Sequence, residues 1–346
     1  MTEMLLAADV TAETSHMLFL SVVTFLLAMF LTPMYTYFAY KYKFWKKQRS
    51  SSTTGEKLTV FNKLHANKFK RHIPTMAGII GVVAITVTTL LFNLDRAETW
   101  LPLAALVGGA IVGLIDDVIN LRGTGTGTAG MRTSVKFLLI TLIGAVLGWL
   151  FYVKLGYTSV HIPYVGDLTL GWWIIPLFTF AVVATGNAVN ITDGLDGLAG
   201  GLLAISFVTF GAIALFQSQF ALAAFCFSVS GALLSYLWFN IYPARFFMGD
   251  VGSFAYGVAL GVVAMLTDTL FLLPIIGLLF VVEAGSSLIQ ITSKKLRGKK
   301  VFISAPIHHH LEAIGWPETK VTMRFWVIAA VCGAIGFWMA VSGGHI

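Results

Sequence analysis

The sequence predicts an all-α, polytopic membrane protein with about ten transmembrane helices and both termini outside, on the side opposite the cytoplasm. Three observations lead to this fold class. The chain is 57% hydrophobic and 11% charged, whereas soluble domains are about 45–50% apolar and about 25% charged. Its apolar residues fall into ten stretches close to the roughly 20 residues that a membrane-spanning helix needs. Its basic residues are concentrated in alternate loops.

Each apolar stretch predicts one span. The first follows an acidic segment and precedes Lys41, the first basic residue, which is the opposite of a signal peptide's basic start, so we expect it to be retained. The only polar break between the eighth and ninth stretches is Thr267–Thr269. The predicted spans are about 17–40, 74–93, 100–116, 135–153, 170–188, 197–216, 220–240, 252–268, 269–291 and 323–342.

The distribution of Lys and Arg predicts the orientation. On one side lie the loops 41–73, 117–136, 188–197, 241–251 and 292–322, and 21 of the 23 Lys and Arg residues lie in or beside them. The other side holds only Arg96 and Lys154. The positive-inside rule places the basic loops in the cytoplasm. We therefore expect residues 1–346 to form a single integral membrane domain, and the net charge of +7 to reflect membrane orientation, not nucleic-acid binding.

Glycine patterns in the chain favour packing over ligand binding. Gly109 with Gly113, and Gly257 with Gly261, have the small-xxx-small spacing that lets membrane helices approach closely. The GxGxxG pattern of Gly125–Gly130 follows no predicted strand and lies in no βαβ unit, so it does not indicate a dinucleotide site.

Four polar clusters fall on the predicted cytoplasmic side. They are Asp116-Asp117, Asn187–Asp196, Asn240–Ser253 and Ala305–Trp316. Helix capping explains one residue of the second cluster, such as Thr192 or Asp193, but not the whole set of amides and carboxylates. Capping is also an alternative for Asp250. Because polar groups at a membrane boundary are costly unless they are satisfied, we expect the clusters to share one site.

The residue types in these clusters favour phosphoryl transfer. Cys226 and Cys332 both lie inside apolar runs, which leaves no Cys-based zinc site, and carboxylates favour a hard cation such as Mg²⁺. The run His308–His310 suits either a metal-binding loop or contacts to a phosphate or carboxylate. Carboxylates, basic side chains and histidines at a membrane surface indicate transfer from a nucleotide diphosphate to a lipid phosphate.

These clusters lie in motifs that resemble those of the polyprenyl-phosphate N-acetylhexosamine-1-phosphate transferases. The resemblance covers about residues 58–330. The Ala305–His310 motif is the one that points to the muramoyl-pentapeptide branch of the family. The matching segments are Pro74–Met76, Asp116-Asp117, Asn187–Leu198, Phe247–Ser253, Leu296–Phe302, Ala305–His310, Gly315–Glu318 and Arg324–Trp326.

The resemblance implies a ten-helix fold with a cytoplasmic active-site cleft, Mg²⁺ dependence and a homodimer in the bacterial cytoplasmic (inner) membrane. Its substrates would be UDP-MurNAc-pentapeptide and undecaprenyl phosphate, and its products lipid I and UMP. Asp250 would bind Mg²⁺, and the catalytic candidates are Asp116, Asp117, Asp250 and His309. The residues implied in substrate binding are Lys70, Thr75, Lys136, Asn187, Asn190, Asp193, Asp196, Asn240, Phe247, Gln290, His308 and His310.

The residues leave the role of Asp116 open between a base, a covalent nucleophile and an electrostatic organiser, because an aspartate of ordinary pKa is a poor base. Two other functions compete with the predicted one. One is a transferase that uses UDP-GlcNAc, and the run His308–His310 argues against it. An ion-coupled transporter would place its carboxylates near the middle of the membrane and show an internal repeat.

Overall fold

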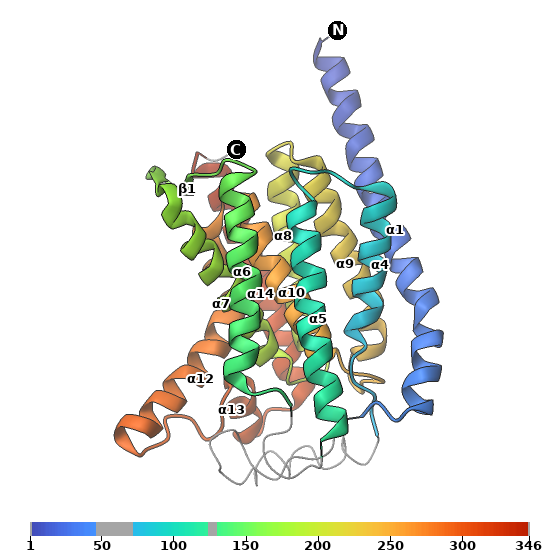
Figure 1. The fold of residues 1–346 in the computed structure, drawn as a ribbon, viewed down its shortest axis with the longest axis vertical. Helices are drawn as coiled ribbons and strands as arrows, with labels where there is room; N and C mark the ends of the chain where they lie inside the picture. Colours follow the sequence, from blue (N-terminus) through green and yellow to red (C-terminus); the bar gives the residue numbers. More distant parts are fainter. Residues whose placement is uncertain (1, 46–71, 124–129, 345–346) are drawn as a thin grey trace.

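The computed structural model describes residues 2–45, 72–123 and 130–344, and Figure 1 shows a bundle of long helices that run alongside one another. The helices are α1 (Thr2–Lys41), α4 (Gly78–Phe92), α5 (Trp100–Arg122), α6 (Thr133–Val153), α7 (Ile174–Thr192), α8 (Leu198–Phe216), α9 (Phe220–Asn240), α10 (Gly249–Leu266), α11 (Leu273–Ile276), α12 (Leu278–Arg297), α13 (Ile307–Ala313) and α14 (Glu318–Ser342). Short 3₁₀ turns at Gly171–Trp173 and Leu270–Leu272 precede α7 and α11.

The described residues contain eight helices that are long and apolar enough to cross a membrane, or nine if a bent pair counts as one span. The chain is thus a multi-pass membrane protein, and each predicted stretch contains helix. Two predicted spans differ from simple straight helices. Helix α4 has only 15 residues because the chain before Gly78 is irregular, with Met76 at φ +75, and the predicted 269–291 span bends by 81° at Gly277, between α11 and α12.

Three helices extend into segments that we predicted to be loops. Helix α5 continues six residues beyond the predicted end at 116, α7 continues to Thr192, and α10 begins at Gly249. Arg122 in the last turn of α5 suits the negative end of the helix dipole. The polar clusters therefore lie on the ends of helices, which hold them more rigidly than loops would.

A small β-hairpin corrects the all-α prediction. Strands β1 (Ser159–Ile162) and β2 (Gly166–Thr169) pair antiparallel, with Ser159 opposite Thr169. This segment joins α6 to α7. Polar and apolar residues alternate in Ser159–Ile162, which suits a strand. Gly166, with φ +107, allows the tight turn between the strands. A hairpin this short leaves the mainly helical architecture unchanged.

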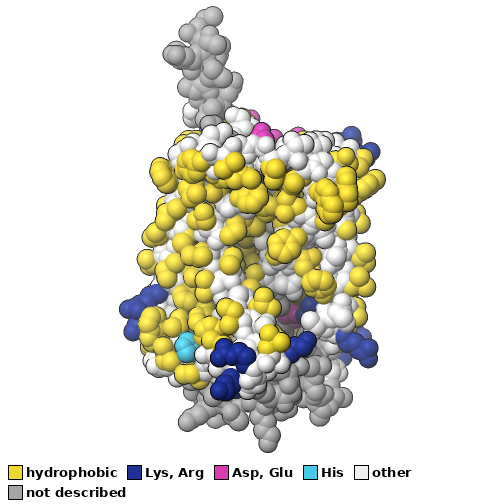
Figure 2. Space-filling view, turned by 90° about the vertical axis from the view of Figure 1, so that its left-hand side faces the viewer, with side chains coloured by type: hydrophobic (Ala, Val, Ile, Leu, Met, Phe, Trp, Pro, Cys, Tyr) yellow, Lys and Arg dark blue, Asp and Glu magenta, His cyan; other side chains and the backbone are white. Residues whose placement is uncertain are grey.

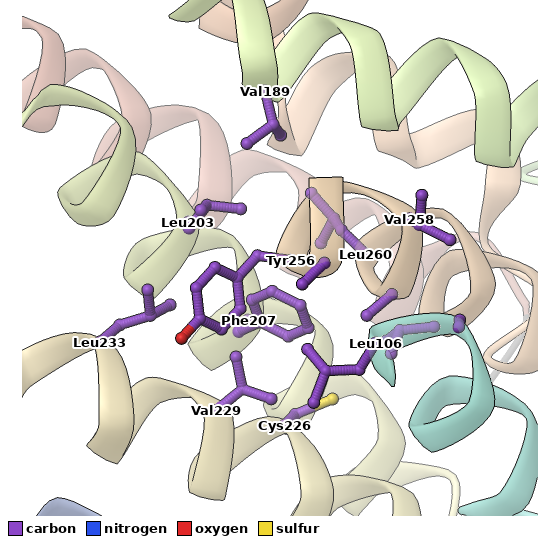
Figure 3. Packing of buried hydrophobic residues seen from close by; sticks show 14 of the residues in the cluster. Leu106, Val189, Leu203, Phe207, Cys226, Val229, Leu233, Tyr256, Val258 and Leu260 are labelled. Atoms are coloured by element: carbon purple, nitrogen blue, oxygen red, sulfur yellow. The ribbon is translucent and has the colours of Figure 1, made fainter. Parts of the chain in front are cut away.

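Helix α10 lies at the centre of the bundle, and 17 of its 18 residues are buried. Figure 3 shows Tyr256 and Leu260 of this helix surrounded by side chains of the neighbouring helices, including Phe207, Cys226 and Leu106. The predicted glycine pairs provide the close approach. A β-carbon at Gly109 or Gly113 would meet the backbone of α10, and one at Gly257 or Gly261 would meet α7. The packing role of these glycines is confirmed.

The surface of the bundle matches a membrane protein. Figure 2 shows a broad apolar belt on one face, with Lys and Arg side chains gathered mainly at its lower edge. Figure 1 shows the start of α1 and the end of α14 at the upper end. The opposite end holds the start of α10 and the ends of α5 and α7, so the polar clusters gather at one end of the molecule.

Candidate active site

An ammonium group bound between two carboxylates forms the centre of the candidate site. Nζ of Lys136 lies 2.7 Å from Oδ2 of Asp116 and 2.8 Å from Oδ2 of Asp250. The three residues come from α5, α6 and α10, and their side chains are 2%, 18% and 15% exposed for Asp116, Lys136 and Asp250. This arrangement brings together three of the predicted site residues. Figure 2 shows acidic and basic atoms between the apolar side chains near the lower end of the belt.

Both carboxylate oxygens of Asp116 accept hydrogen bonds. Oδ1 accepts from the backbone N–H of Met131 at 2.6 Å. Oδ2 accepts from Asn120 Nδ2 at 3.3 Å as well as from Lys136. Asn120 lies one helical turn after Asp116, as i,i+4 neighbours do. The carboxylate is therefore held in one orientation.

The neighbouring Asp117 fixes the start of α10. Its Oδ2 accepts from the backbone N–H of Val251 at 3.0 Å, which places its negative charge at the positive end of the helix dipole. Gly249 has φ +76, and a β-carbon there would lie 2.6 Å from the same oxygen. Only glycine fits this turn without strain. Asp116 and Asp117 thus do different work, since one faces Lys136 and the other anchors Asp250's helix.

The Pro74–Thr75 segment lies beside the Phe247 loop. Phe247 N–H donates to the Pro74 carbonyl at 2.8 Å, and the Phe247 carbonyl accepts from Ala77 N–H at 3.0 Å. Thr75 is buried. Its backbone N–H donates to the Phe44 carbonyl, and its carbonyl accepts from the hydroxyl of Tyr35. These backbone bonds hold the loop that leads into Asp250.

The polar turn between α7 and α8 divides into two groups. Asn190 is half-buried, and its Nδ2 donates to Ser253 Oγ on α10 at 2.8 Å, while Asn187 donates to its own helix. Asp193 is half-buried at the end of α7. Asp196 and Asn240 are buried and form a brace that joins this turn to the loop after α9.

The brace consists of three hydrogen bonds to backbone groups. Asp196 Oδ2 accepts from Ala244 N–H at 2.9 Å. Asn240 Oδ1 accepts from Gly197 N–H at 2.8 Å, and its Nδ2 donates to the Phe246 carbonyl at 2.9 Å. The Asp196 and Asn240 side chains therefore shape the turn.

The three histidines lie on the short helix α13 and have different partners. His308 Nδ1 is 2.8 Å from Glu283 Oε2, and His309 Nδ1 is 2.8 Å from Glu312 Oε2. His310 Nδ1 accepts from Ile303 N–H at 3.3 Å. The run is helical and not the loop that we expected. His308 is buried, whereas His309 and His310 are half-buried.

The donor set of the ion cluster, which consists of Asp116, Lys136 and Asp250, fits a hard cation. In the described part of the chain, no group of three or more His, Cys, Asp or Glu side chains could hold a metal. Two carboxylates nevertheless converge on one cationic nitrogen, and Mg²⁺ typically takes one or two carboxylates with water and substrate phosphate oxygens as its other ligands. Asp250 and Asp116 are therefore suited to Mg²⁺, while the histidines are occupied elsewhere.

Comparison with known proteins identifies the family. The glycosyl transferase family 4 model matches residues 99–268. The phospho-N-acetylmuramoyl-pentapeptide transferase of Chloroflexus aggregans is 37% identical, over 98% of this chain and 93% of its own. The enzymes of the same name from Geobacillus sp. and Clostridium novyi are 38% and 35% identical, over 92% and 93% of this chain and 96% of their own. The chain belongs to the phospho-N-acetylmuramoyl-pentapeptide transferases.

Lys70 and Gln290 are the two remaining predicted site residues of this transferase. Lys70 lies outside the described residues. Gln290 contacts the loop after α12, where its Oε1 accepts from Val301 and Phe302 and its Nε2 donates to the Phe302 carbonyl. Its amide thus organises the loop that precedes α13.

Two acidic residues of the transferase were missed by sequence reasoning. Glu283 is fully buried beside His308, and Glu318 Oε1 accepts from the backbone N–H of Asp196 at 2.6 Å. An acid within a predicted span, such as Glu283, is in itself a signal of function in a membrane protein.

Proposed function

We propose that this chain transfers phospho-MurNAc-pentapeptide from UDP-MurNAc-pentapeptide to undecaprenyl phosphate, giving lipid I and UMP. The observation that carries the proposal is the ion cluster of Asp116, Lys136 and Asp250 at one end of a membrane-embedded bundle. Full-length similarity to enzymes named for this reaction supports it. An oxygen of undecaprenyl phosphate attacks the β-phosphorus, the bond between the two phosphates breaks, and UMP leaves with the electron pair.

We assign Asp116 the role of electrostatic organiser. A covalent nucleophile needs an oxygen that the substrate can reach, but the Asp116 side chain is 2% exposed and Lys136 lies against its Oδ2. The lipid phosphate needs little help from a base, because a phosphomonoester with a second pKa of about 6 is largely dianionic at pH 7. Direct attack by the lipid phosphate therefore accounts for the arrangement better than a phospho-aspartate.

Lys136 and the cation would share the work of charge neutralisation. Asp250 would hold Mg²⁺ with Asp116 beside it, and the bound ion supplies Lewis-acid neutralisation of the diphosphate. When the diphosphate binds, Lys136 can donate to its oxygens, since three N–H groups allow it to contact more than the two carboxylates. Asn190, Asp193 and the histidines of α13 would contact the nucleotide and the sugar–peptide.

We place the ion cluster on the cytoplasmic side of the bacterial inner membrane, with both termini outside. The concentration of Lys and Arg in the loops at that end supports this orientation. We count α4 and the bent α11–α12 pair as two of ten crossings. The whole chain forms one domain and pairs as a homodimer, which the mass of the purified complex in detergent would test.

A direct assay tests the reaction. Purified protein is incubated with Mg²⁺, undecaprenyl phosphate and radiolabelled UDP-MurNAc-pentapeptide, and we expect a lipid-linked product together with one UMP per turnover. Removal of Mg²⁺ with EDTA should stop the transfer. A lipid-linked product from UDP-GlcNAc alone would contradict the substrate assignment. Ion transport without any transfer would contradict the enzyme.

A further inference from the structure

A buried acid–histidine pair joins α12 to α13 at the edge of the site. Glu283 lies in the second turn of α12, and its Oε2 is 2.8 Å from Nδ1 of His308. Their side chains are 0% and 1% exposed. Ser286 donates to the Glu283 carbonyl and accepts from Ile307 N–H, both bonds within 2.9 Å. Helix α13 is therefore fixed against α12 at this pair.

The other nitrogen of the His308 ring faces the polar turn of the site. A β-carbon at Gly194 would collide with Nε2 of His308. Gly194 follows Asp193 and lies within the turn that leads from α7 to α8. The imidazole thus fills the space between Glu283 on one side and the turn that we assign to the substrate pocket on the other. The contact of Nδ1 with Glu283 sets the orientation of the ring, and Nε2 is the ring nitrogen that lies against the turn.

Burial constrains the charge of the pair. An isolated carboxylate away from water is far more costly than a pair with no net charge. A Glu283–His308 pair without net charge has one proton between Oε2 and Nδ1 and a second proton on Nε2. This holds whether the shared proton lies nearer the glutamate or the imidazole. Other ionisable groups beside the pair are His309, whose ring centroid is 4.1 Å from that of His308, Glu312, which is bonded to His309, and Asp193, which directly precedes Gly194.

We propose that Glu283 is a positioning residue for the transfer reaction: it orients His308 and keeps a proton on Nε2. His308 then presents an N–H donor to the Gly194 turn, which we assign to the substrate pocket, and so fixes the position of that turn. Glu283 itself touches no substrate and acts only through the imidazole, as carboxylates that orient histidines do in other sites. The proposal rests on the proposed transfer function.

Nitrogen NMR of protein labelled with ¹⁵N-histidine tests the pair without any assay of activity. His308→Gln assigns the His308 signals. In the wild-type protein we expect Nε2 to have the chemical shift of a protonated ring nitrogen. In Glu283→Gln the amide can donate to or accept from Nδ1, so Nε2 should shift toward the value of an unprotonated nitrogen. An unprotonated Nε2 in the wild-type protein would overturn the proposal.

Kinetics provide the second test. We expect Glu283→Gln to lower kcat about 10- to 100-fold, the usual cost of losing a residue that orients a functional histidine, with KM for undecaprenyl phosphate unchanged. Glu283→Asp should recover part of the loss. The matched control is Glu98→Gln, because Glu98 accepts hydrogen bonds from the backbone of Leu222 and Ala221, away from the site.

Glu98→Gln should keep wild-type kcat, and a Glu283→Gln variant with wild-type kcat would refute the positioning role. If the wild-type protein makes no lipid-linked product, the proposed function fails, while the NMR experiment still decides the state of the pair.

Discussion

Replacement of Lys136 by Met tests the centre of the site most directly. Methionine keeps the length of the side chain but leaves Asp116 and Asp250 without their shared cation. Lys136 makes two charge-assisted hydrogen bonds of 2.7 and 2.8 Å, and each such bond contributes about 1.5–3 kcal/mol. Breaking a buried ion pair costs about 3–5 kcal/mol. Because 18% of the Lys136 side chain is exposed, we expect a loss near the lower end, about 3 kcal/mol.

Thermal unfolding in detergent measures this loss. Cys226 and Cys332 are both free and buried, so a thiol-reactive dye reports their exposure. At roughly 2 °C for each kcal/mol, the Tm of Lys136→Met should fall by about 6 °C without Mg²⁺. Added Mg²⁺ should raise the Tm of the variant more than that of the wild type, because the ion no longer competes with the ammonium for the carboxylates; at 100 times its Kd the gain is about 2.7 kcal/mol.

Lys154→Met is the control for this experiment, since Lys154 is exposed just after the other end of α6. Its Tm and its response to Mg²⁺ should match those of the wild type. Two results together would refute the reasoning that the ammonium and the metal ion use the same carboxylates. Lys136→Met and the wild type would have equal Tm values without Mg²⁺, and added Mg²⁺ would shift both Tm values by the same amount.

Three further predictions concern other residues. Asp116→Asn should keep activity above background but lower it about 100-fold, and a trapped phospho-aspartate would contradict its role as organiser. Gly113→Ala should destabilise the protein by about 1–3 kcal/mol, since its β-carbon would meet the Asp250 carbonyl, whereas Gly285→Ala, with open space, should stabilise it by about 0.5–1 kcal/mol. Burial lowers the pKa of His161, but the Asp167 hydrogen bond and the Gly343 carbonyl outweigh it, so the pKa is raised. The stability that wild type has over His161→Gln should therefore be complete below pH 6.5 and lost as the pH rises through the raised pKa, measured as Tm against pH.

The sequence predicts the apolar spans well because burial in a membrane imposes a length and a composition on every crossing helix. It also predicts that Asp116, Asp250 and the 187–196 turn lie at one end of the molecule, because span counting decides the end at which each loop emerges. It does not predict which side chains meet. The contact between Lys136 and Asp250 joins residues 114 positions apart, and its existence depends on the packing of α5, α6 and α10.

The sequence was least informative where a polar side chain forms hydrogen bonds with backbone groups. Asp196, Asn240 and Gln290 look like ligand-binding residues by type, but their side chains form hydrogen bonds with backbone groups of nearby loops. No local pattern distinguishes an amide that braces a loop from one that binds a substrate. The bend at Gly277 is equally hidden, because an apolar stretch of suitable length predicts a span whether it is straight or broken.

Glycines on both sides of α10 determine how closely the neighbouring helices approach it. Gly113 lets the backbone of α5 contact the Asp250 carbonyl, and Gly257 and Gly261 let α7 approach the opposite side of α10. Without these glycines the helices would lie farther apart, and one Lys136 nitrogen could not reach carboxylates on two helices at 2.7 and 2.8 Å. The apolar packing of the membrane-spanning helices thus sets the geometry of the charged site, which is why substitutions that only change helix spacing should alter catalysis as well as stability.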